Sequence, residues 1–234
     1  MSNFRTTLIL LLGATLVFGN VSQGLASPAD QSIPAPAITA APAASPQPLA
    51  GRTILIDPGH GGKDPGAARA GVEEKNITLA VSLLLRDKLE SLGAKVDLTR
   101  DADVAVSLPE RLTDSNTSCP DIFLSIHVNS VRLSRVAGIE TYYYDGRGRL
   151  LASMVLDTLA FQLRTPAKWS HARDLHVLVG NRVPATLAEI GYLTNPPSRA
   201  LLRTPAYQER VAVSLADSLL DYFAAPGVPH GCQA

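Results

Sequence analysis

Four ionisable side chains lie where predicted secondary-structure elements begin or end: His60, Glu74, His127 and Glu189. Two imidazoles and one carboxylate form a ligand set that suits catalytic zinc, because three protein ligands leave a fourth position for water. A further carboxylate that does not bind the metal could move the proton of that water. The chain therefore offers the groups for metal-assisted hydrolysis, although the intervals are long and no compact HExxH motif occurs.

Each of these side chains also has an ordinary structural explanation when it is considered alone. His60, in the segment IDPGHGGKDPGA, could be a solvent-exposed loop residue, and His127 could be a hydrogen-bonded core residue. Glu74 could be a favourable charge at a helix N-terminus. Glu189 is harder to explain, because a carboxylate in the apolar run TLAEIGYL needs a partner or a shifted pKa. Ligands gather at strand ends in α/β sheets, so His60, His127 and Glu189 could converge.

Other kinds of active site have little support. The chain has no GxSxG elbow, P-loop or dinucleotide GxGxxG motif. Its 21 basic and 21 acidic residues predict no nucleic-acid interface. Cys119 and Cys232 lack a neighbouring base, and an exported chain could join them in a disulfide. Two separate free thiols are at least as well supported, because Cys119 lies beside a predicted strand and Cys232 in a Gly/Pro-punctuated tail.

Residues 51–225 are predicted to form one α/β domain, because strand-length apolar runs alternate with longer helical patterns. The predicted strands cover residues 53–56, 94–99, 121–127, 138–143, 175–179 and 186–190. The predicted helices cover residues 76–92, 109–115, 148–163 and 207–223.

The two ends of the chain have different compositions from this domain. Residues 1–26 combine a positive start, a short apolar run and small residues, which is typical of a cleaved signal peptide, with an uncleaved anchor as the alternative. Residues 27–50 are an Ala/Pro-rich linker that cannot form a core, and residues 226–234 are a C-terminal tail. The mature chain is expected to be exported to the periplasm or cell wall without stable membrane insertion.

The ordered motifs of the domain resemble those of the zinc-dependent N-acetylmuramoyl-L-alanine amidases of the Amidase_3 group. The resemblance covers nearly all of residues 52–223. It rests on ILIDPGHGGKDPGA, GVEEKNITLA, GAKVDLTRDAD, SLPERLTDSN, DIFLSIHVNS, GIETYYY and PATLAEIGYLTN. It implies a single α/β domain with a mixed, mostly parallel central sheet of about six strands and helices on both faces.

The resemblance implies a role for each of the four side chains. His60, Glu74 and His127 would bind one Zn²⁺, and Glu189 would be the catalytic carboxylate. The implied reaction is hydrolysis of the amide bond between the N-acetylmuramic acid lactyl group and L-alanine in peptidoglycan, by zinc-activated water. Another zinc-dependent peptidoglycan peptidase, such as a carboxypeptidase, and a non-catalytic wall-binding regulator are the alternatives.

Two further positions are expected to contact substrate. Asn129 follows the SIHV run, and Arg182 stands near Val179, where the family often has Arg. That cationic group is therefore either missing or supplied by Arg182. The interval between His127 and Gly138 is too short for the long helix with which some relatives block the metal, so we expect an open cleft. We also expect a monomer.

Overall fold

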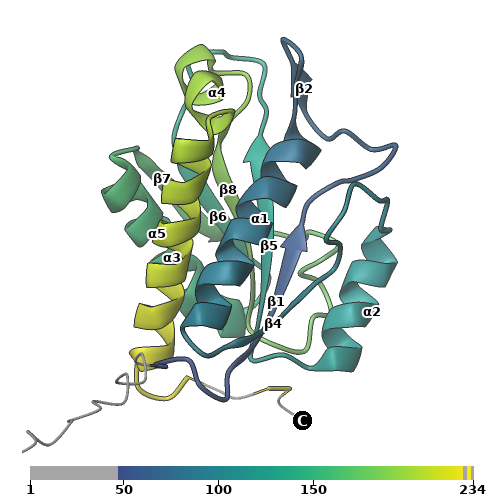
Figure 1. The fold of residues 1–234 in the computed structure, drawn as a ribbon, viewed down its shortest axis with the longest axis vertical. Coiled ribbons are helices and arrows are strands. Elements are labelled where there is room, and N and C mark those ends of the chain that lie inside the picture. The colour runs from purple at the N-terminus through teal and green to yellow at the C-terminus, as the bar shows by residue number, and fades with distance from the viewer. Residues whose placement is uncertain (1–46, 229–230, 233–234) are drawn as a thin grey trace, which may run out of the picture. The chain divides into compact units, whose positions relative to one another are not determined.

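The computed structural model describes residues 47–228 and 231–232 (Figure 1). The predicted signal peptide and residues 27–46 of the predicted linker lie outside the described residues. The strands are β1 (Thr53–Pro58), β2 (Ala68–Arg69), β3 (Val72–Glu73), β4 (Lys95–Leu98), β5 (Ile122–Asn129), β6 (Ile139–Tyr143), β7 (Ala167–Ala172) and β8 (Ala185–Tyr192). The helices are α1 (Glu74–Ser91), α2 (Leu108–Ser118), α3 (Gly146–Leu163), α4 (Pro196–Leu202) and α5 (Pro205–Ala224).

A six-stranded sheet forms the centre of the fold, in the order β4-β1-β5-β8-β6-β7. The first four strands are parallel, β6 runs antiparallel to β8, and β7 runs parallel to β6. Strands β1 and β5 are buried along most of their length, as expected of parallel strands covered on both faces. The predicted mixed, mostly parallel sheet is therefore confirmed.

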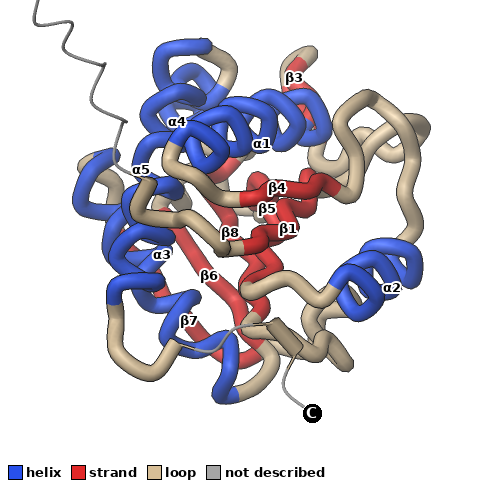
Figure 2. The backbone as a smooth tube through the Cα atoms, turned by 60° about the horizontal axis from the view of Figure 1, so that its bottom comes forward, coloured by secondary structure: helices blue, strands red, loops and turns tan. Residues whose placement is uncertain are grey.

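Helices cover both faces of this sheet, which confirms the predicted layers. Helices α1, α3 and α5 lie on one face and α2 lies on the other (Figure 2). The apolar stripes of the three long helices pack on Ile54, Ile56, Leu124 and Ile126 in the larger core cluster. The intervening residues Leu55 and Phe123 point to the opposite face and enter the smaller core cluster.

The predicted strand over residues 175–179 is wrong. Those residues form a turn, in which the Leu178 amide donates to the Leu175 carbonyl at 2.8 Å. Their apolar side chains pack beneath this loop in the smaller core cluster, so the pattern reports burial and not strand pairing. Instead β7, which the sequence did not predict, forms the edge strand from the half-polar, largely exposed sequence AKWSHA.

The start of the folded domain is also corrected. Leu49, which the prediction placed in the linker, is 1% exposed and packs in the larger core cluster. Its amide donates to the Leu92 carbonyl at 3.0 Å, which ties the segment to the end of α1. The folded part therefore includes residues 47–50, and the linker boundary at residue 50 was placed too late.

At the other end, the structure pairs Cys119 with Cys232 in a disulfide whose Cα atoms are 5.3 Å apart. Of the two alternatives that the sequence left open, the structure therefore shows the disulfide and not the free thiols. The bridge attaches the tail to the residue that caps α2, across 113 residues of chain. Spacing could not indicate this, because the two cysteines meet only once the sheet has formed.

No helix of the described residues is long and apolar enough to cross a membrane.

Candidate metal centre and active site

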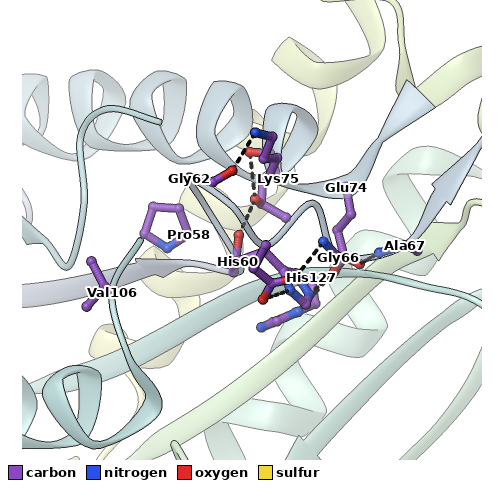
Figure 3. A network of polar contacts seen from close by, with 12 residues as sticks. Pro58, His60, Gly62, Gly66, Ala67, Glu74, Lys75, Val106 and His127 are labelled. Carbon is purple, nitrogen blue, oxygen red and sulfur yellow. Dashed lines mark hydrogen bonds and ion pairs between the residues drawn. The ribbon is translucent and has the colours of Figure 1, made fainter. Parts of the chain in front are cut away.

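Three side chains from separate elements meet at the carboxyl ends of β1 and β5 (Figure 3). His60 follows β1, Glu74 begins α1, and His127 lies near the end of β5. Glu74 Oε1 lies 3.2 Å from His60 Nε2 and 3.0 Å from His127 Nδ1. The ligand atoms of all three residues lie within 4.8 Å of one another. The structure thus brings together the three residues that the sequence suggested as metal ligands.

Glycines in the loop after β1 leave room for these rings. A Cβ atom on Gly59 would lie 2.4 Å from the His127 ring, and one on Gly66 would lie 2.5 Å from the His60 ring. Both positions exclude any larger residue unless the rings move. His60 itself has a φ of 61°, a conformation that non-glycine residues seldom adopt. The conformation of the loop therefore makes room for both imidazole rings, and the residue with the strained backbone is His60 itself.

Two buried arginines, which the sequence did not indicate, hydrogen-bond to the backbone of this loop. Arg100 donates from Nε to the Pro58 carbonyl at 2.9 Å and from Nη2 to the Gly59 carbonyl at 2.8 Å. Arg111 forms an ion pair with buried Asp57 and donates from Nη2 to the His60 carbonyl at 2.7 Å. Both arginines are 3% exposed, and their place in the TRDAD and PERL segments was the only signal in the sequence.

Backbone amides fix the orientation of the Glu74 carboxylate. Oε1 accepts from the Val128 amide at 2.8 Å, and Oε2 accepts from the Ala67 amide at 2.8 Å. Burial raises the pKa of Glu74, but hydrogen bonds from His127 and His60 outweigh it and hold the pKa well below the usual value. Glu74 therefore stays ionised at every pH near neutrality, as a metal ligand must.

The geometry of the three residues fits a cation with tetrahedral coordination. Metal bonds of about 2.1 Å place two ligands of such a site about 3.4 Å apart, close to the observed 3.2 and 3.0 Å. The outer nitrogen of His60, Nδ1, lies 2.8 Å from Asp64 Oδ2. A carboxylate on the far side of a ligating imidazole orients the ring and strengthens its binding. The donor set and its support therefore suit Zn²⁺.

Replacing Asp64 with Asn is expected to weaken zinc binding by about 10–100-fold, as loss of such an outer carboxylate usually does. Competition with a chelator of known affinity measures the change. Asp101→Asn, an exposed aspartate beyond β4, is the matched control and should bind zinc like the wild type. Equal zinc affinity in Asp64→Asn and the control would show that Asp64 does not support His60.

Glu189 stands on β8 directly opposite His127 of β5 and opposite Glu140 of β6. Its Oε2 atom is buried and has no hydrogen-bond partner among the described residues. Burial raises the pKa of Glu189 well above the usual value, the Glu74 and Glu140 carboxylates raise it further, and Arg173 opposes the shift. An unpartnered carboxyl group of this kind beside a metal site is suited to accept and return a proton.

Glu140 is a second buried carboxylate that the sequence analysis did not single out. Tyr142 Oη donates to its Oε2 at 2.6 Å, Asn129 Nδ2 donates to the same atom at 3.0 Å, and the Tyr192 hydroxyl donates to Oε1. Its charge is therefore compensated by hydrogen bonds, unlike that of Glu189. A glutamate inside the strand segment GIETYYY was the available signal.

A hollow of about 610 Å³ opens over the two histidines. His60 and His127 line it, and their side chains are 24% and 19% exposed. Residues 130–138, where no blocking helix was expected, contain no helix or strand. The imidazoles are therefore open to a ligand from this side.

The two residues expected to contact substrate lie in different places. Asn129 ends β5 and lines a second hollow, next to Glu140. Arg182 lines neither hollow, and its amide donates to Asn116 Oδ1 at 2.9 Å, beside α2. Arg173, which the sequence did not indicate, opposes the raised pKa of Glu189 through its charge.

Comparison with known proteins gives a consistent result. Residues 54–221 match the protein family described as N-acetylmuramoyl-L-alanine amidase. Over 192 residues the chain is 36% identical to the uncharacterized protein YqiI of Bacillus subtilis, covering 80% of this chain and 93% of that protein. It is 33% identical over 199 residues to the germination-specific N-acetylmuramoyl-L-alanine amidase of the same organism, covering 78% and 84%.

Solved structures agree with these relatives. An N-acetylmuramoyl-L-alanine amidase from Clostridium difficile superposes with a TM-score of 0.73 at 30% identity, covering 76% of this chain and 100% of that one. The amidase AmiC2 of Nostoc punctiforme superposes with a TM-score of 0.72 at 34% identity, covering 74% and 98%.

Proposed function

Because the chain belongs to the N-acetylmuramoyl-L-alanine amidase family, we propose that His60, Glu74 and His127 hold a single Zn²⁺ for amide hydrolysis. The bond cleaved joins the lactyl group of N-acetylmuramic acid to L-alanine in peptidoglycan. The observation that carries the zinc proposal is the convergence of two imidazoles and one carboxylate, from three separate elements, within 4.8 Å.

When bound, Zn²⁺ supplies a Lewis acid for the amide carbonyl. Glu189 takes a proton from the attacking water as the new C–O bond forms. It then passes that proton to the amide nitrogen as the C–N bond breaks, which leaves the amine of L-alanine and a lactyl carboxyl group. The second proton of the water moves from that carboxyl group to the amine, so the products are a carboxylate and an ammonium group. The raised pKa of Glu189 makes its carboxylate a stronger base for the proton of the attacking water than an ordinary carboxylate would be.

Analysis of the products of purified peptidoglycan tests this function. We expect intact stem peptides whose new N-terminus is L-alanine, with glycan strands that keep their lactyl carboxylates. A carboxypeptidase would instead release single amino acids from the C-terminal end of the stem peptide. A wall-binding protein without activity would release nothing, and either of these two results would reject the amidase assignment.

The remaining expectations extend this proposal to the whole chain. We propose that residues 1–26 direct export, that residues 27–46 tether the domain, and that the mature chain acts as a monomer at the cell wall. Asn129 lines the second hollow and remains our candidate for substrate contact. Arg182 also remains a candidate, although no contact with either hollow supports it.

A further inference from the structure

Two hollows lie on the face of the sheet that carries the Glu189 side chain. The hollow over the histidines includes Leu187, and the second hollow, of about 660 Å³, includes Glu140 and Tyr142. Leu187 and Tyr142 are register partners, as are Glu189 and Glu140, so these side chains share a face. We call the second hollow the β7 groove. Its lining includes Arg132, Glu140, Tyr142, Lys168, Trp169 and Arg173.

The β7 groove concentrates positive charge in a chain whose 21 basic and 21 acidic residues balance. Arg132, Lys168 and Arg173 line it, and Glu140 is the acidic residue among its lining. The charge of Glu140 is already compensated by hydrogen bonds from Tyr142, Tyr192 and Asn129. The cations on the rim are therefore left to attract an anionic ligand.

Two of these cations lie over aromatic rings. Lys168 Nζ lies 5.0 Å from the centre of the Trp169 ring, and the Arg173 guanidinium lies 5.2 Å from the centre of the Tyr142 ring. Trp169 is nonetheless 52% exposed, so part of its ring is free to pack on a bound ligand. Cations that are already positioned lose less freedom when they bind a carboxylate.

The direction of proton transfer indicates which part of the substrate lies here. The reacting amide has a glycan on its carbonyl side and the stem peptide on its nitrogen side. Glu189 delivers its proton to the nitrogen, so the peptide leaves from the side of the site on which Glu189 stands. On that side, β8 is followed by β6, which carries Glu140, and then by β7, which carries Lys168 and ends just before Arg173.

We propose that the β7 groove binds the stem peptide of the substrate through its free carboxylates, with Arg173 and Lys168 as the carboxylate-binding groups. This inference rests on the proposed function. The glycan is uncharged apart from its lactyl groups and gives the cations little to bind. The hollow over the histidines has no excess of cations, because its lining combines Lys63 and Arg111 with three carboxylates, and it is left for the glycan.

The test compares two soluble N-acetylmuramoyl peptides that differ only in whether the carboxylates of the peptide are free or amidated. For the wild-type protein, amidation is expected to raise KM by about tenfold, as the loss of one charge-assisted hydrogen bond would. Arg173→Gln and Lys168→Gln should each raise KM for the free-carboxylate substrate by a similar factor and change KM little for the amidated one. Arg203→Gln, an exposed arginine after α4, is the matched control and should match the wild type.

The Lys168→Gln variant controls for an indirect effect on catalysis. Arg173 affects the proton affinity of Glu189, whereas Lys168 is not among the groups that affect it. Equal KM values of the wild type for both substrates would overturn the inference. So would variants whose KM changes with glycan length and not with peptide charge, since that pattern places the glycan in the β7 groove. No cleavage of either substrate by the wild type would instead reject the amidase function on which the inference rests.

Discussion

Replacing Glu189 with Gln is expected to lower the rate of peptidoglycan hydrolysis by at least about 100-fold, as the loss of a general acid and base usually does. The amide of Gln can neither accept a proton from water nor pass one to the leaving nitrogen. Glu189 is not one of the three proposed ligands, so zinc content should stay at one ion per chain. Rates of stem-peptide release, measured together with metal content, check both expectations.

Stability measurements separate this loss of activity from unfolding. The pKa of Glu189 is raised in the folded protein, so ionising it costs stability. That cost is absent below the ordinary carboxyl pKa and grows as the pH rises through the raised one. Glu189→Gln removes the cost and should be at least as stable as the wild type at pH 7. Glu90→Gln, at an exposed position of α1, is the control. Near-normal turnover by Glu189→Gln would remove Glu189 from the mechanism.

The sequence predicted the central strands of the sheet, whose side chains are buried on both faces. Apolar runs identified β1, β5 and β8, because a short continuous run of this kind is typical of a central strand that is buried on both faces. The same rule failed at residues 175–179, where the apolar side chains are buried under a loop. It also missed β7, because an edge strand with one neighbour can be polar and still pair.

In the candidate site, too, the sequence predicted some residues and missed others. Short motifs named His60, Glu74 and His127, and the structure brings these residues together. What supports them could not be read from spacing, because Arg100, Arg111 and Asp64 act through contacts that form only in three dimensions. Glu140 and Arg173 were missed for the same reason. Both residues affect the pKa of Glu189, which is their neighbour in the folded protein and not in the sequence.

Replacing His127 with Ala is expected to abolish both zinc binding and hydrolysis. The substitution removes one of three ligands, so zinc affinity should fall further than the roughly 10–100-fold expected when only an outer carboxylate is lost. It also leaves the buried Glu74 carboxylate without one of its hydrogen-bond partners. Metal content after dialysis and the rate of stem-peptide release measure the two losses. Treating the wild type with a chelator should reproduce the inactive state, and added Zn²⁺ should restore activity to the wild type alone.

Thermal unfolding provides a readout that does not depend on catalysis. A metal that binds the folded chain raises the melting temperature as its concentration increases, because binding favours the folded state by mass action. Zn²⁺ should therefore raise the Tm of the wild type and of Glu189→Gln, and should leave that of His127→Ala unchanged. A variant that lacks His127 and still gains stability from Zn²⁺ like the wild type would show that the ion binds elsewhere. The convergence of His60, Glu74 and His127 would then have to come from the hydrogen bonds among them alone.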